Sequence, residues 1–456
     1  MSLSRYREYK DSGHEWLAEV PQHWNVKRVK RLVSSIEQGW SPQCENWAVD
    51  GEDEWGVLKV GCVNGGVFNP LENKKLPSEL TAIPELGIAQ GDLLISRANT
   101  RELVGSAAVA TKDYRNLLLC DKLYRLRLQS EQCTPHFLSC YLGIEEVRGQ
   151  IELAATGASS SMLNIGQSVI LELPVPLPPF KEQLAIAAFL DRETSMIDTL
   201  ISEQEKLLTL LAEKRQAVIS HAVARGLNPD APKKDSGVAW LGDVPVHWEV
   251  VGLTKYLESV VDYRGRTPTK VDEGVFLVTA KNIRDGVIDY ESSKEYIGTA
   301  EYDEVMRRGL PKVGDVLFTT EAPLGQVALV DREDIALAQR VIKFRGESTH
   351  LDNRFLKFWI MGDACQFNLA QLATGSTALG IKGSKIGQVR LCLPPLDEQA
   401  AIVGHIERNV VELDALKTEA ERAVELLKER RSALISAAVT GKIDVRGQSL
   451  ALEAAA

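Results

Sequence analysis

The stretch Leu177-Pro178-Pro179-Phe180-Lys181-Glu182-Gln183 decides the fold of this chain, because a close copy returns in the second half as Leu393-Pro394-Pro395-Leu396-Asp397-Glu398-Gln399. The agreement continues downstream, where residues 214–220 match residues 430–436 at the same offset. A fixed offset held over dozens of residues indicates an internal duplication. We therefore expect the chain to contain one structural unit twice.

A second repeated motif lies upstream of each copy. Val20-Pro21-Gln22-His23-Trp24 returns as Val244-Pro245-Val246-His247-Trp248. Between these anchors the match is thinner, but Asn64 and Asn282 still correspond, at an offset close to those of the two motifs. Each half is thus a variable globular part followed by a repeated segment.

The repeated segment is predicted to be a long helix, since residues 181–225 contain neither Gly nor Pro and the run ends at Gly226. Its apolar positions follow a heptad, with one seam passing through Leu190, Ile197 and Leu211. Such a stripe could belong to a surface helix of its own domain. We favour packing of the two copies against each other, antiparallel, because a duplicated unit most readily buries its seam about a pseudo-two-fold axis. A break within residues 191–194, where polar residues crowd, stays open.

The globular parts are predicted to mix helix and strand. Gly91-Asp92 and Gly314-Asp315 each form a turn that feeds a short buried strand. Tyr124, Leu126 and Leu128 alternate with arginines, a period of two that predicts a half-buried strand, and residues 341–345 repeat it. One helix is expected over residues 135–153 and another over 353–372, each followed by a polar loop and a Pro-rich strand.

The fold class is therefore α+β, with two variable domains joined by two long repeated helices packed as an antiparallel coiled coil. The expected boundaries are a first domain at 1–179, which includes a repeat segment at 11–29, a central helix at 180–228, a second domain at 229–394, a C-terminal helix at 395–444 and a tail at 445–456.

Composition restricts the classes of protein. The chain has 456 residues, 44% of them apolar and 25% charged, and no apolar run approaches the roughly 18 residues that span a bilayer. Its first residues lack the apolar block of a signal peptide, so we expect a cytoplasmic protein without membrane contact. Seven cysteines without a Cys-x-x-Cys pair are expected to be small core residues. A net charge of -10 counts against a protein that coats nucleic acid along its whole length, but it allows a local DNA-binding face.

A search for catalytic motifs found none that fits. Leu177-Pro178-Pro179-Phe180 differs from the Asn/Asp-Pro-Pro-aromatic loop of amino-methyltransferases, because Leu177 cannot accept a hydrogen bond from the amine. The glycines at 375–380 lack the Gly-Lys-Ser/Thr ending of a phosphate-binding loop, and the seven histidines lack metal-ligand spacing. We expect no catalytic residue, no metal and no cofactor in this chain.

The combination of these features looks like the specificity subunit of type I restriction-modification enzymes. The doubled Pro-Pro-x-x-Glu-Gln helix, the two Gly-Asp strands and the two Ala-Thr-Gly loops (residues 155–157 and 373–375) carry the resemblance, which covers nearly the entire chain. It implies a noncatalytic subunit that reads a bipartite, asymmetric sequence in double-stranded DNA with two target recognition domains. It also implies docking of two modification subunits that methylate adenine at N6, and of two restriction subunits. S-adenosylmethionine, ATP and Mg²⁺ are expected on those partners.

Candidate DNA-binding residues come from loops that differ between the copies and from side chains that match base edges or phosphates. The loop after the first Gly-Asp strand is longer than its counterpart and carries two arginines and an asparagine. The full set is Gln38, Trp40, Asn64, Arg97, Asn99, Arg101, Ser159, Ser160, Arg264, Arg266, Lys281, Asn282, Arg284, Thr320, Ser376, Thr377 and Lys382.

Two other functions stay open on the sequence alone. One is a noncatalytic coiled-coil scaffold that never touches DNA, which explains the helices but not the variable domains. The other is a free-standing DNA methyltransferase or nuclease, which the absence of fitting motifs disfavours.

Overall fold

The computed structural model describes residues 4–129, 131–159, 162–264, 267–375 and 379–447. The chain divides into two compact units, the first made of residues 1–203 and 423–456 and the second of residues 204–422. Each unit therefore holds one globular domain and one half of each long helix. The domain boundaries expected from the sequence stay a prediction, because the units divide within the helices.

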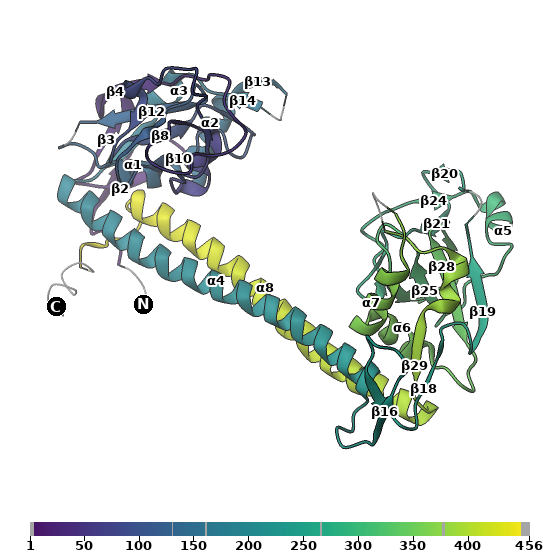
Figure 1. Ribbon diagram of the computed structural model, residues 1–456. Coiled ribbons are helices and arrows are strands. Elements are labelled where there is room, and N and C mark those ends of the chain that lie inside the picture. Colours follow the sequence, from purple (N-terminus) through teal and green to yellow (C-terminus); the bar gives the residue numbers. More distant parts are fainter. Residues whose placement is uncertain (1–3, 130, 160–161, 265–266, 376–378, 448–456) are drawn as a thin grey trace. The chain divides into compact units, whose positions relative to one another are not determined.

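The first unit is a mixed α and β domain (Figure 1). Its elements are β1 (Tyr9–Asp11), β2 (Glu19–Pro21), β3 (Asn25–Arg28), β4 (Val33–Gln38), β5 (Gly56–Leu58), β6 (Asn73–Lys75), β7 (Gly87–Ile88), β8 (Leu93–Ser96), β9 (Ala98–Asn99), β10 (Ala107–Val109), β11 (Tyr114–Leu118), β12 (Leu123–Leu128), α1 (Pro135–Leu142), α2 (Glu145–Ala154), β13 (Thr156–Ser159), β14 (Met162–Asn164), α3 (Gln167–Leu171), β15 (Pro174–Leu177) and the start of α4 (Phe180–Arg225).

The second unit is also a mixed α and β domain, with a similar but not identical order of elements. Its elements are β16 (Lys233–Asp235), β17 (Asp243–Pro245), β18 (Glu249–Gly252), β19 (Leu257–Asp262), β20 (Lys270–Val271), β21 (Val275–Val278), β22 (Ile283–Arg284), β23 (Val287–Ile288), β24 (Tyr296–Ile297), α5 (Tyr302–Val305), β25 (Val316–Thr319), β26 (Val327–Leu329), β27 (Ile335–Leu337), β28 (Val341–Gly346), α6 (Asn353–Met361), α7 (Asp363–Leu372), β29 (Arg390–Leu393) and the start of α8 (Leu396–Val439).

Both domains are built on the same central antiparallel sheet. The strand order is β10-β8-β12-β4 in the first unit and β26-β25-β28-β19 in the second, so each strand has a counterpart. A second sheet covers one face of each, ordered β6-β5-β11-β7 and β20-β24-β21-β27, and each contains one parallel pair, β5 with β11 and β21 with β27. The structure thus confirms the two mixed domains and their common framework.

The strands after the Gly-Asp turns are buried along their whole length, as expected. The neighbouring strands β12 and β28 are also mostly buried, so the prediction of a half-buried strand is wrong: Arg125 and Lys343 are only 1% and 2% exposed. Arg125 donates from Nη1 to the Gly87 carbonyl in the second sheet, at 2.8 Å. The second sheet therefore covers the face that the charged residues were expected to turn to water.

The basic residues of β12 and β28 pair with the aspartates of the Gly-Asp turns. Buried Arg125 also pairs with Glu37, whereas Arg127 is exposed. Arg127 Nε lies 2.9 Å from Asp92 Oδ1, and Arg125 Nη1 lies 3.6 Å from Asp92 Oδ2. In the second unit, Asp315 pairs with Lys343 at 3.1 Å and with Arg345 at 2.6 Å. Because a buried charge without a partner is costly, each Gly-Asp turn fixes its strand against the next one.

The two predicted single helices after the central sheet are each broken in two, at Gly143 and at Gly362. A Cβ on Gly362 would lie 2.9 Å from Val223 Cγ2 on α4, so this break brings the backbone close to the long helix. By contrast α4 runs without interruption through residues 191–194. The crowded polar residues there lie on a continuous helix, so the possible break is not present.

The long helices are paired antiparallel within each unit. In the first unit Asp198 of α4 binds Arg431 of α8, and Leu190, two turns earlier on α4, lies in the same core cluster as Ala438, two turns later on α8. In the second unit Arg215 binds Asp414 at 3.4 Å, and Ile219 shares a core cluster with Ile406. The predicted seam residues Leu190, Ile197 and Leu211 of α4 are buried, which confirms the antiparallel coiled coil.

Candidate DNA interface

The two repeated motifs meet at the start of each long helix. Glu182 Oε2 lies 2.9 Å from His23 Nε2, and Trp24 Nε1 donates to Glu182 Oε1 at 3.2 Å. Glu398 makes the same contacts with His247 at 2.7 Å and with Trp248 at 3.0 Å. A carboxylate at the first turn is also favoured by the positive end of the helix. These motifs therefore hold each domain to its helix.

The neighbouring Gln183 and Gln399 add further hydrogen bonds between each domain and its long helix. Gln183 Oε1 accepts from the Thr134 N–H at 2.8 Å, and its Nε2 donates to the Pro178 carbonyl at 3.0 Å. Gln399 binds the Asp352 N–H and the Pro394 carbonyl in the same way, at 2.9 and 2.8 Å. Both side chains are fully buried. The Pro-Pro-x-x-Glu-Gln motif thus holds the lead-in strand, the following helix and the N-cap of α1 or α6 together.

Four predicted DNA-binding residues gather at one end of the first central sheet. Gln38 at the end of β4 and Arg97 after β8 both donate to the carbonyl of Asp121, at 3.1 and 3.3 Å. Asn99, two residues beyond Arg97, donates from Nδ2 to Asn64 Oδ1 at 3.3 Å. We call this end of the sheet, with Gln38, Asn64, Arg97 and Asn99, the first reading edge.

The other predicted residues of this domain surround the first reading edge less closely. Trp40 is half-buried and packs against the core between the two sheets. Arg101 is exposed and forms an ion pair with Glu152 at 2.8 Å. β9, which contains Asn99, pairs with β14 and through it with β13, the strand in which Ser159 lies. The Ser159 side chain and Ser160 lie outside the described residues.

The second central sheet has an equivalent end. Thr320 follows β25 as Arg97 follows β8, but it is buried, and its hydroxyl donates to the Arg340 carbonyl at 3.2 Å. Arg264, after β19, binds Asp262, with Nε 2.9 Å from Oδ2. Burial raises the pKa of the Asp262 carboxyl, but the bonds from Arg264 outweigh it and hold that pKa below its ordinary range. Lys382 is exposed. Its neighbour Gly383 lies close to this pair, because a Cβ on Gly383 would lie 2.5 Å from Arg264 Nη2.

We call this end, with Arg264, Thr320, Arg340 and Lys382, the second reading edge. Three residues predicted for the same region, Arg266, Ser376 and Thr377, lie outside the described residues. The second edge therefore has the same position in its domain as the first, with a different set of side chains.

The stretch around Asn282 divides into accessible and inaccessible residues. Lys281 is exposed and lines a cavity of about 390 Å³ with Lys270, Gln339 and Arg340. Arg284 is exposed, with Asp285 at 3.5 Å. Asn282 is fully buried, and its amide accepts from Thr279 and donates to the carbonyls of Asp289 and Ser293. In this conformation the Asn282 amide is used to hold a loop and presents no edge to a base.

The sequence analysis missed Lys122 and Arg340, which directly precede the equivalent strands β12 and β28 at the two reading edges. The Arg97 N–H donates to the Lys122 carbonyl at 2.8 Å, and the Thr320 N–H donates to the Arg340 carbonyl at 3.0 Å. The two basic residues are related by the same offset as Asn64 and Asn282. Extending that offset to the strand starts would have identified them.

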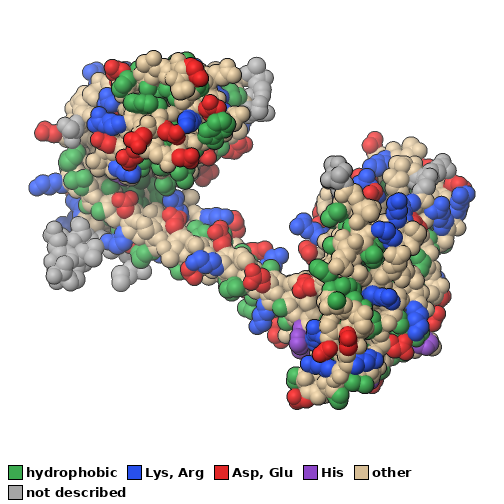
Figure 2. Space-filling view, in the orientation of Figure 1, with side chains coloured by type: hydrophobic (Ala, Val, Ile, Leu, Met, Phe, Trp, Pro, Cys, Tyr) green, Lys and Arg blue, Asp and Glu red, His purple; other side chains and the backbone are tan. Residues whose placement is uncertain are grey.

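The chemistry of the described surface fits contact with a polyanion. Figure 2 shows Lys and Arg side chains gathered over the end of the second domain that carries β20, β21 and β24 in Figure 1.

Among the described residues, no cluster of three or more His, Cys, Asp or Glu side chains could hold a metal ion. No described helix is both long enough and apolar enough to cross a membrane.

Comparisons with known proteins agree with this architecture. The family model for the type I restriction modification DNA specificity domain matches twice, at residues 22–209 and 257–425. The putative type I restriction enzyme MjaX specificity subunit of Methanocaldococcus jannaschii is 23% identical over 94% of this chain and 96% of its own length. The EcoEI specificity subunit of Escherichia coli is 29% identical, over 40% of this chain and 31% of that protein.

Solved structures show the same fold. A chain from a study of complex assembly and conformational transition of the type I R-M system superimposes with a TM-score of 0.69, at 16% identity, and covers 92% of this chain and 98% of that one. The HsdS subunit from Thermoanaerobacter tengcongensis gives a TM-score of 0.52, at 16% identity, and covers 93% and 98% of the two chains. Because the family model matches both domains and more than half of the chain, this protein belongs to the family of type I restriction-modification DNA specificity subunits.

Proposed function

We propose that this specificity subunit reads a bipartite, asymmetric DNA target, one half with each domain. One observation supports this most strongly: the two domains share a sheet order and a fastening to the long helices, yet their reading edges differ in length and chemistry. A common framework holds both edges in the same way, whereas different side chains suit different bases. A symmetric target would need two similar edges.

We also propose that two modification subunits dock, one on each unit. The helix pair of the first unit carries Leu200 and Leu426, each more than half exposed. The second unit carries the equivalent residues, Leu416 and Leu210, which are also more than half exposed. Exposed apolar side chains on paired helices are typical of surfaces that bury against a partner. Two equivalent leucine pairs fit two identical partners.

In this proposal the chain catalyses nothing itself. The adenine-N6 methyl transfer, with S-adenosylmethionine, belongs to the modification subunits, and ATP and Mg²⁺ act on two restriction subunits that join the complex. The complex acts on DNA in the cytoplasm.

A titration tests the docking. The modification subunit is added to this chain, and the mass of the complex is measured by light scattering. We expect saturation at two partners per chain. The double variant Leu200→Glu with Leu426→Glu should bind one partner, and the matched variant Leu210→Glu with Leu416→Glu should also bind one. Saturation at one partner with the unchanged chain would contradict the stoichiometry.

DNA binding by the same complex distinguishes a specificity subunit from a coiled-coil scaffold. A specificity subunit gives a complex that retains one duplex sequence over a scrambled competitor in fluorescence anisotropy. A coiled-coil scaffold gives a complex without sequence preference. Binding of S-adenosylmethionine by the chain alone, in calorimetry, would support a free-standing methyltransferase instead.

A further inference from the structure

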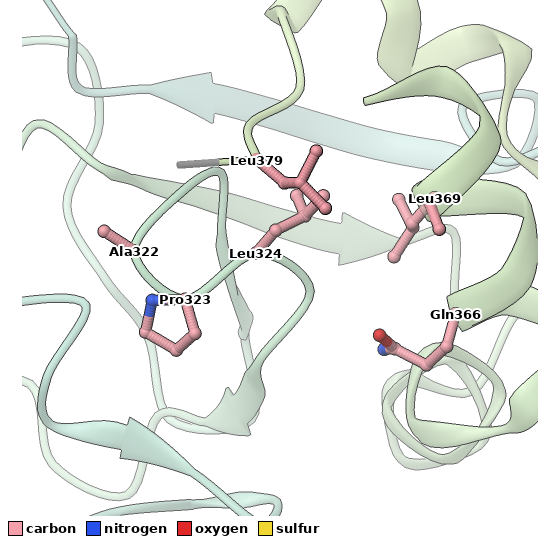
Figure 3. A pocket seen from close by; sticks show the side chains of 7 residues that line it. Ala322, Pro323, Leu324, Gln366, Leu369 and Leu379 are labelled. Carbon is pink, nitrogen blue, oxygen red and sulfur yellow. The ribbon is translucent and has the colours of Figure 1, made fainter. Parts of the chain in front are cut away.

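The second domain has an apolar depression beside its reading edge. It has a volume of about 420 Å³ and is lined by Ala322, Pro323, Leu324, Gln366, Leu369, Ala370 and Leu379. Figure 3 shows Leu379 next to Leu324, which is on the same loop as Pro323, and the helix that carries Gln366 and Leu369 lies opposite them. Leu379 is 56% exposed, so the depression presents an accessible apolar wall.

Comparison of the domains explains why the depression exists. In the first domain the longer loop places Arg101 against Glu152 of α2, in an ion pair of 2.8 Å. Glu152 corresponds to Ala370 at the offset that relates the two domains, and Ala370 lines the depression. The shorter loop of the second domain has no charged residue at 322–324 and leaves this place open. The same surface thus carries a charged pair in one domain and is apolar in the other.

The depression is continuous with the second reading edge. The Ile381 N–H donates to the Thr320 carbonyl at 2.9 Å, and Gly380 forms a β-bridge with Glu321. Leu379 is therefore tied directly to the edge. Ala322 lines both the depression and the cavity that holds Lys281 and Arg340. Arg340 also pairs with Glu321 at 2.9 Å. A polyanion bound by Lys281 and Arg340 would lie next to the apolar wall and would compete with Glu321 for Arg340.

The backbone at this junction is held in an uncommon conformation. Ala322 has a φ of 51°, in the left-handed region that favours glycine. Such a conformation costs free energy and persists where surrounding contacts impose it. The contacts around Ala322 therefore hold the loop in one shape beside the depression.

We propose that this depression receives the 5-methyl group of a thymine in the half-site that the second domain reads. This inference rests on the proposed function. In the major groove the thymine methyl is the apolar feature of the base edges, and it distinguishes thymine from the other three bases. Leu324 and Leu379 supply the apolar contact, and Arg340 and Lys382 hold the neighbouring phosphates. The first domain, with Arg101 and Glu152 in this place, reads its half-site without such a contact.

Uracil substitution tests the proposal, because it removes only the methyl group. The complex of this chain with its modification subunits is titrated against duplexes in which each thymine of the target is replaced by deoxyuridine, one at a time, in anisotropy measurements. We expect about three- to fivefold weaker binding at one position in the second half-site, the effect of one buried methyl group. No single substitution in the first half-site should weaken binding comparably.

Two variants link that effect to the depression. Leu379→Ala, at the surface, and Leu324→Ala should bind thymine and uracil duplexes equally. Val313→Ala is the matched control, because Val313 is similarly exposed at the opposite end of β25 and should keep the full thymine preference.

Three results would overturn the proposal: no sensitive thymine in the second half-site, equal sensitivity in both half-sites, or an unchanged thymine preference in Leu379→Ala. Loss of the modification subunit from Leu379→Ala would show that the depression is a protein contact instead. A complex that binds no duplex specifically would contradict the proposed function itself, and this inference with it.

Discussion

The two domains are alike where they contact the long helices and different at the solvent-exposed reading edges. Glu182 and Glu398 bind the same His and Trp pair, and the central sheets have the same strand order. After the Gly-Asp strand, however, the first domain has Arg97 and Asn99 accessible, whereas the second has a buried Thr320 and an apolar loop. A duplicated framework can thus be kept while one short loop changes the chemistry that it presents.

The shared framework also differs in detail between the two units. Matched substitutions in the two units are therefore expected to cost unequal amounts of unfolding free energy. Glu182 is 6% exposed and also accepts from the Tyr6 hydroxyl, whereas Glu398 is 25% exposed. Asp92 shares Arg125 with Glu37, whereas Asp315 lies between Lys343 and Arg345. Matched variants in the two units can therefore separate shared structure from local chemistry.

The largest effect is expected for Asp315→Asn. This change leaves Lys343 buried without its acid, and we expect a loss of roughly 3–5 kcal/mol of unfolding free energy in the second unit. Asp92→Asn in the first unit should cost less, about 2 kcal/mol, since Glu37 still neutralises Arg125. Hydrogen exchange with mass spectrometry measures each unit separately. Equal losses in the two units would contradict this comparison.

The ion pairs of Asp315 also predict that the unfolding free energy of the second unit depends on pH. Burial raises the pKa of the Asp315 carboxyl, but the bonds from Arg345, the Lys312 N–H and Lys343 outweigh it and hold that pKa below its ordinary range. A depressed folded pKa gives stability that is fully present above the unfolded value, about 3.9, and is lost as the pH falls through the folded value. Unfolding of the second unit, followed by denaturant titration from pH 7 to pH 2, should therefore lose this contribution below about pH 4. Asp315→Asn should lack that part of the dependence, and an unchanged profile would argue against it.

A smaller effect is expected at the helix joints. Glu182→Ala removes an acceptor of three side-chain hydrogen bonds and should cost roughly 3 kcal/mol in the first unit. Glu398→Ala removes an acceptor of two bonds at a more exposed place and should cost about half as much in the second. Exchange rates at the start of α4 and of α8 report the two losses. A larger loss at Glu398 would reverse the comparison.

The smallest effect on the protein, but a direct one on DNA, is expected at the reading edges. Arg97→Ala should weaken target binding by the complex about tenfold and relax the preference at one base pair of the first half-site. Thr320→Ala, at the equivalent position, should change affinity little, because its hydroxyl is already bound to the Arg340 carbonyl. Anisotropy with single-base variants of the target measures both. Equal effects would mean that the two edges are used alike.

The fold was largely predictable because the decisive signals are repeated and long. A run free of Gly and Pro from 181 to 225, followed by a second copy of the segment in which Gly404 is the one interior glycine, leaves few alternatives to paired helices. The errors arose where tertiary contacts override a local pattern. Arg125 alternates with leucines as an exposed residue would, but a second sheet and Asp92 surround it. Gly143 and Gly362 lie inside helical patterns, yet they end the helices.

The candidate site was less predictable than the fold. Gln38, Arg97 and Asn99 gather at one edge, as residues near neighbouring strand ends can, and Asn64 joins them from the 3-10 segment Val60–Gly66. Asn282 was predicted to bind DNA together with Lys281 and Arg284, but its amide is used to close the loop that follows it. The apolar depression follows from what the shorter loop leaves unfilled, a feature that only the packed structure shows. Which of these residues contact bases stays a prediction.

An exchange of one domain tests the independence of the two readers most directly. Residues 20–150 are replaced by the equivalent segment of a related specificity subunit, and the methylated sequence is determined by methylome sequencing of cells that also express the modification subunit. Because separate cores that share no contacts behave additively, we predict a new first half-site and an unchanged second half-site. A change in both half-sites would contradict the model of two independent reading edges.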